Sequence, residues 1–375
     1  MQRLISILLP REQDKIKQLV ISKCQNSISA LISLGLISMA TPVFACPSGG
    51  HRILTLSPTG VEIKVNGRNQ YQPAKVDNSL SNSDYIRLAR GASAVIYCEN
   101  ASIWNITSQG TYQVSQGCSS TKRRRNCDDT LRPINDPSKP YLISPRKTQV
   151  LTNQPIIRWN AVEGATSYKV EVSGAKFDWE TTVSQTEVVY SGEQALEPGY
   201  YKVTITTDKG LSNKTDNEPG FVVLSDGKVE EITAEIEQLQ QQLPDDESQV
   251  LAQIYLYRSH RLNAAAIELL ETLVQEGDQT EAIYQILGET YDLIGLPRLA
   301  REPYVKALEL SRVNENLEGQ ASNQVSLGEI DVALGQVQQA VEWLKAAQNV
   351  YRALGDEAQV EKLQSRLDYL ETKLN

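Results

Sequence analysis

Histidine is nearly absent from this sequence. Only His51 and His260 occur among its 375 residues, and they are far apart in the chain. A histidine-based metal site and a Ser–His–Asp triad are therefore poorly supported. The sequence also lacks a glycine-rich phosphate loop and a recognisable catalytic turn. We expect a protein that is not an enzyme and that carries no metal and no cofactor.

An excess of positive charge is lacking as well. The formal net charge is −9, and residues 247–375 hold 11 Lys and Arg against 20 Asp and Glu. An acidic region of this kind repels phosphate, which argues against nucleic acid as the main partner. The charged fraction of 22% and the apolar fraction of 40% are typical of folded soluble proteins. The length leaves room for roughly two to four domains.

The start of the chain has a short apolar run. Residues 28–40 are uncharged and mostly apolar, and lysines precede them. The run is too short to span a bilayer and predicts an export signal over residues 1–45, cleaved before Cys46. Residues 43–46 are similar to a bacterial lipobox, which would make Cys46 a lipidated membrane attachment. We expect an exported protein of the periplasm or cell envelope; a retained anchor and a buried core helix are the alternatives.

Three cysteines follow in the segment that we expect to be exported. Cys98 and Cys118 lie at the ends of successive strand-like runs, and Cys127 lies further on. Exported cysteines tend to pair, so we predict a Cys98–Cys118 disulfide. The alternative is that all three are buried free thiols. The sequence leaves the pairing of Cys127 open.

Residues 281–312 carry the clearest pattern in the chain. Apolar and small side chains recur at helical spacing on two stretches, separated by a turn at residues 295–297. They are Tyr284, Leu287, Gly288, Tyr291, Ala300, Tyr304 and Ala307. Gly288 and Ala300 are small, which allows two helices to cross closely. The pattern resembles a tetratricopeptide repeat (TPR), a helix–turn–helix unit of about 34 residues that needs neighbours to bury its face.

Weaker copies of this pattern lie on either side. One begins 34 residues earlier, at Glu247, and another begins 40 residues later, at Ala321. The extra residues, around 313–320, resemble a longer variant of the repeat in which the first helix starts early. A closing helix is expected over residues 356–374. We therefore predict an all-α TPR-like array over residues 247–375, preceded by an amphipathic linker helix within residues 226–246.

The first part of the mature chain, residues 46–130, is predicted to be an all-β domain. Val61 and Ile63 alternate with polar residues, and residues 85–88 and 94–97 form further strand-like runs. Residues 60–61, 84–87 and 91–95 resemble the FecR-like β domain of bacterial envelope proteins. The resemblance implies a small β scaffold in an envelope compartment. A linker is predicted over residues 131–140, and the basic run at residues 122–125 is read as part of the solvated connection.

A second β domain is predicted over residues 141–225. Residues 168–172 and 201–205 alternate strictly between apolar and polar side chains, with turn signals between the runs. Trp159 and residues 196–201 resemble a fibronectin type III domain, in which the early tryptophan belongs to the core. This family implies spacing or adhesion rather than chemistry. The predicted architecture is thus an all-β N-terminal half and an all-α C-terminal half.

In a TPR array the first helix of each repeat lines a concave groove. The resemblance implies that the positions facing inward here are Tyr255, Arg258, Gln285, Glu289, Asp292, Val325, Glu329 and Val332. Their acidic character predicts a protein partner whose Lys or Arg side chains lie against Glu289, Asp292 and Glu329. A merely solvated face would look the same.

Two functions follow from this architecture. We predict a non-enzymatic envelope protein that binds another protein or peptide through the groove, displayed on β-domain spacers. The alternative is a structural tether or a cell-wall adhesion protein in which the β domains make the contacts.

Overall fold

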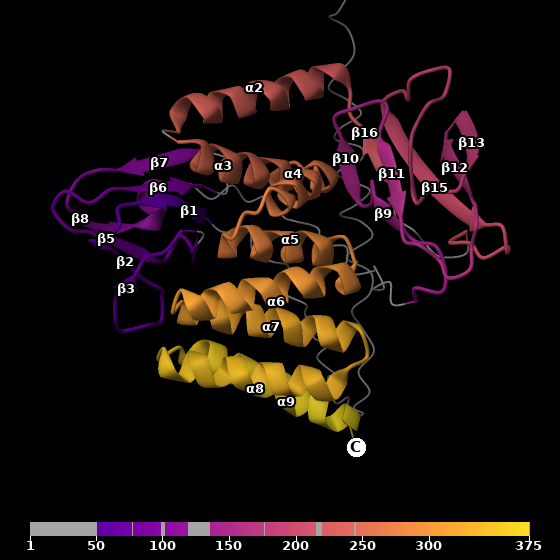
Figure 1. The fold of residues 1–375 in the computed structure, drawn as a ribbon. Helices are drawn as coiled ribbons and strands as arrows, with labels where there is room; N and C mark the ends of the chain where they lie inside the picture. The colour runs from indigo at the N-terminus through magenta and orange to yellow at the C-terminus, as the bar shows by residue number, and fades with distance from the viewer. Residues whose placement is uncertain are drawn as a thin grey trace, which may run out of the picture. The chain divides into compact units, whose positions relative to one another are not determined.

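The computed structural model describes residues 51–76, 78–98, 102–118, 136–175, 177–214, 220–243 and 245–374. The predicted signal at residues 1–45, Cys46, the basic run at residues 122–125 and Cys127 lie outside these residues. Strands occupy the N-terminal half and helices the C-terminal half (Figure 1), as the sequence predicts. None of the described helices combines the length and apolar character that a membrane span requires.

Residues 51–118, the first β segment, form two four-stranded sheets. One has the order β4-β1-β6-β7 and the other β3-β2-β5-β8. The strands are β1 (His51–Leu56), β2 (Val61–Lys64), β3 (Gln72–Pro73), β4 (Ser79–Leu80), β5 (Tyr85–Leu88), β6 (Ala94–Tyr97), β7 (Ile103–Ile106) and β8 (Gly110–Gln113), followed by η1 (Val114–Gln116). Alternation places Val61 and Ile63 on the buried face of β2, against Ile86 of β5 and Ile96 of β6.

Residues 141–223, the second β segment, also form two sheets. Their orders are β10-β16-β15-β12-β13 and β14-β11-β9. The strands are β9 (Leu142–Ser144), β10 (Thr148–Val150), β11 (Ile156–Trp159), β12 (Tyr168–Gly174), β13 (Phe177–Val183), β14 (Glu187–Val189), β15 (Gly199–Thr207) and β16 (Phe221–Val223). Trp159 is buried in their common core, where its ring meets the edge of Tyr168. This is the core role that the sequence predicts for Trp159.

Eight described helices follow. They are α2 (Asp226–Gln242), α3 (Asp246–Ser259), α4 (Asn263–Gln275), α5 (Glu281–Leu293), α6 (Pro297–Val313), α7 (Leu317–Ala333), α8 (Val337–Ala353) and α9 (Glu357–Leu374). From α3 onward each helix packs on the next one along the chain. Three helix pairs therefore stack, α3–α4, α5–α6 and α7–α8, and α9 closes the array. The extra residues before the third repeat extend α6 and start α7 early.

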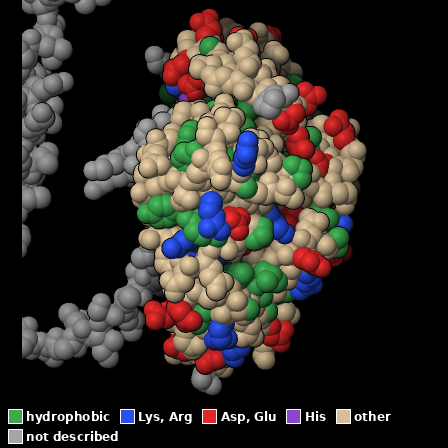
Figure 2. All heavy atoms as spheres, turned by 90° about the vertical axis from the view of Figure 1, so that its left-hand side faces the viewer, with side chains coloured by type: hydrophobic (Ala, Val, Ile, Leu, Met, Phe, Trp, Pro, Cys, Tyr) green, Lys and Arg blue, Asp and Glu red, His purple; other side chains and the backbone are tan. Residues whose placement is uncertain are grey.

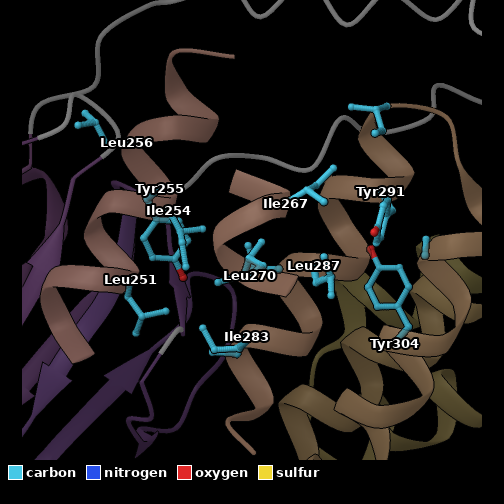
Figure 3. Packing of buried hydrophobic residues seen from close by; sticks show 14 of the residues in the cluster. Leu251, Ile254, Tyr255, Leu256, Ile267, Leu270, Ile283, Leu287, Tyr291 and Tyr304 are labelled. Atoms are coloured by element: carbon cyan, nitrogen blue, oxygen red, sulfur yellow. The ribbon is translucent and has the colours of Figure 1, made fainter. Parts of the chain in front are cut away.

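The small residues of the pattern lie where the helices cross. A Cβ atom on Gly288 of α5 would lie 3.0 Å from ring atoms of Tyr304 of α6, and one on Gly328 would lie 2.7 Å from Leu344 of α8. A methyl group at either position would force the facing side chain to shift. Figure 3 shows the packing on either side, with Leu270 of α4 and Leu287 of α5 filling the space between helices.

Both β segments contact the helices. We did not predict these contacts from the sequence, which led us to describe the β segments as spacers. Leu54 and Tyr97 of the first segment belong to the same apolar cluster as α3 and α5. In the second segment the Arg146 Nε donates to the Ile294 carbonyl at 2.8 Å, and Arg158 pairs with Glu271 of α4 at 2.8 Å. The surface of the helical array is therefore partly covered by the rest of the chain.

Candidate functional site

The first helices of the repeats lie side by side, and charged residues connect them. The Arg258 guanidinium of α3 lies 3.0 Å from the Glu289 carboxylate of α5. Glu329 of α7 accepts two hydrogen bonds from Arg366 of α9, at 2.9 and 2.6 Å. Three of the inward positions that the sequence selects, Arg258, Glu289 and Glu329, therefore take part in ion pairs on the surface formed by α3, α5, α7 and α9. We call it the inner surface.

Glu289 lies at the middle of the inner surface and is buried. Its side chain accepts a hydrogen bond from Gln285 at 3.1 Å, and its carboxylate lies 3.8 Å from the Arg52 guanidinium of β1 as well as close to Arg258. Burial raises the pKa of Glu289, but the two arginines outweigh it, so the pKa falls below its ordinary value. Glu289 is therefore ionised and paired at neutral pH.

Asp292 lies about one turn further along α5. Its exposure, its partners and its pKa all differ from those of Glu289. Its side chain is exposed to solvent, and no hydrogen bond or ion pair to it is found within the described residues. The pKa of Asp292 is raised to about 6, because neighbouring protein partly desolvates it and because Glu329 and Glu289 repel its charge. The side chain is thus open to water on one side and crowded by protein and negative charge on the other.

The two valines of the inner surface are half-buried. Val325 and Val332 of α7 pack against the apolar cluster of the last three helices, which includes Leu344 and Leu363. Part of each side chain is therefore used by the fold itself.

Tyr255 is covered by the first β segment rather than facing an open groove. Its ring lies 5.5 Å from the ring of Tyr97 of β6, and the Arg52 guanidinium lies 5.9 Å from its centre. Tyr255 is only 6% exposed, and Figure 3 shows it where α3 meets the strands of the first segment. Tyr255 and Glu289 are therefore not open positions, because Arg52 and Tyr97 of the first β segment pack on them.

A second contact between the first β segment and the helices depends on Arg68. Its guanidinium donates at 2.6 and 3.0 Å to Asp356, at 2.8 and 3.2 Å to Glu318, and at 3.2 Å to Gln72. These five bonds match the five N–H donors of an arginine side chain. Burial lowers the pKa of Arg68, but the carboxylates of Glu318 and Asp356 raise it by more. The pKa of Arg68 therefore lies above its ordinary value. Sequence reasoning missed Arg52 and Arg68, because neither lies in a motif.

A cavity of about 300 Å³ remains between these two contacts. Its walls come from the turns around β2–β4 and from α5, α7 and the α6–α7 turn. Gln285, which the sequence predicts as a groove residue, is part of the lining. The inner surface therefore has three parts: a covered part around Tyr255, this cavity, and an open part around Asp292.

The cysteines lie in the core of the first β segment. Cys98 and Cys118 are joined by a disulfide, with their Cα atoms 5.3 Å apart. His51 is buried beside them, with a ring nitrogen within 4.8 Å of both sulfur atoms. Its Nε2 lies 3.0 Å from the Asn82 Oδ1 atom. With the two sulfurs bonded to each other, neither thiolate is present to bind a metal ion.

Comparisons with known proteins find similarity only to solved structures, over about two fifths of this chain. The sequence matches no protein-family model, and no curated protein matches it. BtubC (BKLC) from P. vanneervenii is 20% identical over 38% of this chain and 64% of its own length, with a TM-score of 0.33. The chain therefore matches less than two thirds of BtubC.

Two further solved structures are similar over about the same share of this chain. MamA MSR-1 is 19% identical over 40% of this chain and 91% of its own, with a TM-score of 0.26. A putative kinesin light chain with TPR-like repeats from Podosopora anserina is 20% identical over 40% and 90%, with a TM-score of 0.27. Similarity this low carries no functional argument. The FecR-like and fibronectin-like resemblances stay predictions.

Proposed function

We propose that this chain is a non-enzymatic scaffold of the cell envelope that binds a segment of another protein on its inner surface. An array of antiparallel helices presents a long surface whose side chains are held by packing, and such surfaces suit protein partners. The envelope location rests on the sequence of residues 1–45 and on the disulfide, because disulfides persist in oxidising compartments. Attachment through a lipidated Cys46 is part of the proposal.

One observation carries the binding part of this proposal: Asp292 is exposed between two acidic side chains whose own charges are already paired. Arg52 and Arg258 neutralise Glu289, and Arg366 neutralises Glu329. A Lys or Arg of a partner placed against Asp292 would offset the desolvation and the repulsion from Glu329 and Glu289 that together raise its pKa. The partner is therefore a protein that presents a basic side chain, and its association should weaken with salt.

Affinity capture from an envelope extract tests this function. The full chain is compared with Asp292→Lys and with Glu302→Lys, an exposed acidic residue on α6 that provides a matched control. We expect Asp292→Lys to lose the partner and Glu302→Lys to retain it. Equal recovery of the partner by all three proteins would contradict binding at the inner surface.

The second candidate, adhesion through the β segments, has one observation in its favour. Ile156 of β11 and Val189 of β14 are cross-strand neighbours, and they are 47% and 51% exposed. Exposed apolar side chains that lie next to each other suit a contact surface. The double variant Ile156→Lys with Val189→Lys should abolish capture under this alternative and leave it unchanged under the first.

A further inference from the structure

We propose that His51, Cys98 and Cys118 form a metal site when the Cys98–Cys118 disulfide is reduced, and that this site binds a thiophilic cation, Zn²⁺ or Cu⁺. The disulfide and the metal ion are then two alternative ways of joining the same cysteines. The inference does not depend on the inner surface, because the three side chains lie in the core of the first β segment. It makes this segment responsive to reductant and metal.

The three side chains offer the ligands that such a cation selects. One ring nitrogen of His51 and the two sulfur atoms all lie within 4.8 Å of one another. Ligand atoms on a tetrahedral zinc ion are roughly 3.5–3.8 Å apart, since zinc binds sulfur at about 2.3 Å and nitrogen at about 2.0 Å. Rotation of the cysteine side chains, whose Cα atoms are 5.3 Å apart, provides that separation after reduction. Thiolate and imidazole together favour Zn²⁺ and Cu⁺.

Backbone hydrogen bonds hold the three ligands in place without help from the disulfide. His51 begins β1, which pairs with β4 and with β6. The Cys98 N–H donates to the Ser102 carbonyl at 2.8 Å, and the Cys118 N–H donates to the Val114 carbonyl at 3.0 Å. Reduction breaks none of these bonds, so the three side chains remain together.

Asn82 holds the ring of His51 in a form that binds a metal ion. The His51 Nε2 lies 3.0 Å from the Asn82 Oδ1, and a carboxamide oxygen accepts hydrogen bonds without donating any. Nε2 therefore carries the proton and Nδ1 carries the lone pair. Metal-binding histidines almost always donate their second ring N–H to an oxygen or a water in this way. The group that orients the histidine is thus present.

Burial favours an ion that cancels the charge of the thiolates. His51, Cys98 and Cys118 are each at most 1% exposed, and an unpaired charge in such surroundings is costly. Zn²⁺ with two thiolates and a neutral imidazole carries no net charge, and it takes a fourth ligand such as water. Cu⁺ leaves one negative charge but is satisfied by three ligands. The shared chemistry is a filled-shell cation held by two sulfurs and one nitrogen.

Formation of the site is a balanced exchange. A dithiol reductant gives two electrons and two protons to the disulfide, which becomes two thiols, while the reductant becomes a disulfide. The metal ion then replaces both thiol protons, which pass to solvent, and accepts lone pairs from sulfur and nitrogen. Oxidation of the two thiolates expels the ion, because a disulfide has no thiolate to bind it.

Metal titration of the reduced full chain tests the inference. The chain has five cysteines, so Cys24→Ser, Cys46→Ser and Cys127→Ser leave Cys98 and Cys118 as its thiols. The protein is reduced with dithiothreitol, freed of reductant without oxygen, and titrated with Zn²⁺ and separately with Cu⁺ against a chromophoric chelator. The same protein with its disulfide intact is titrated in parallel.

We expect one ion per reduced chain and none per oxidised chain. His51→Gln should weaken binding at least tenfold, and His260→Gln, which changes the other histidine of the sequence, should stay within twofold. The ion that binds more tightly identifies the cation. Failure of both ions to bind would overturn the site. Equal affinities of His51→Gln and His260→Gln would also overturn it, since the thiols alone would then hold the ion.

A second variant keeps the test decisive if His51→Gln does not fold, which circular dichroism of the reduced protein shows. Asn82→Leu leaves all three ligands and removes the oxygen that orients the ring. Loss of such an orienting group typically costs about 10–100-fold in metal affinity. We expect a loss in this range for folded Asn82→Leu, and affinity within twofold of the parent chain would contradict the assigned role of His51.

Discussion

The Arg52 guanidinium of β1 lies 3.8 Å from the Glu289 carboxylate of α5, and both side chains are about 10% exposed. This contact joins the first described strand to the middle of the helical array. It also means that the groove residue which the sequence assigns to a partner is neutralised by the chain's own arginines, Arg52 and Arg258. The acidic character of the inner surface is therefore concentrated at Asp292.

Replacing Glu289 by Gln should destabilise the protein. The change removes the carboxylate between two mostly buried guanidinium groups, and loss of one partner of a buried pair costs about 3 kcal/mol. The folded-state pKa of Glu289 is lowered, so its contribution is present above the unfolded pKa and is lost as the pH falls through the folded value. Urea unfolding of both proteins at neutral pH, and at successively lower pH, measures both effects. Glu302→Gln, on an exposed site of α6, is the control and should change the free energy by less than about 0.5 kcal/mol.

Asp292→Asn should stabilise the protein at neutral pH. The folded-state pKa of Asp292 is about 6, above its ordinary 3.8, so the folded state binds a proton more tightly than the unfolded state. Ionised Asp292 therefore lowers the free energy of unfolding, increasingly as the pH rises from about 4 to about 6. The variant should melt at a higher temperature than the parent protein at pH 7.5, and the difference should disappear near pH 4. A difference that is independent of pH would contradict the raised pKa.

Gly328→Ala should destabilise the third repeat. The added Cβ would lie 2.7 Å from Leu344 in the buried helix crossing, and overpacking of a core costs about 1–3 kcal/mol, partly offset by the better helix propensity of alanine. Gly227→Ala in α2 is a matched control, because nothing lies within 4 Å of its Cβ position. Thermal unfolding of both variants tests the crossing. Equal melting temperatures would mean that the crossing tolerates a methyl group.

Loss of the Cys98–Cys118 disulfide should also destabilise the protein. The bond closes a loop with a sequence separation of 20, and in the chain-entropy model such a loop contributes about 3 kcal/mol. Non-reducing peptide mapping of protein from the envelope should recover the linked peptides, and Cys98→Ser with Cys118→Ser should unfold at lower urea. Free thiols at both positions in the native protein would contradict the pairing.

The helical half was predictable because its signals are local. The spacing of Leu287, Gly288 and Tyr291, and the small Ala300, report helix crossings that depend on residues within one repeat. Strict alternation located the strands for the same reason, since a side chain's face follows from its neighbours two residues away.

The covered part of the inner surface was not predictable in this way. Arg52 and Arg68 lie in a β segment with no motif around them, and their carboxylate partners come from α5, α7 and the α8–α9 turn. Such contacts depend on how segments far apart in the sequence pack together, and this packing produces no periodic pattern in the sequence. A surplus of carboxylates on α5 and α7 was visible, but the source of the compensating arginines was not.

The most direct test of the central claim is hydrogen exchange of the full chain with and without its captured partner. We predict that the partner slows exchange in α5 (Glu281–Leu293) and α7 (Leu317–Ala333), the helices that carry Asp292 and Glu329. Protection confined to β11 and β14, around Ile156 and Val189, would contradict it and would support adhesion through the second β segment.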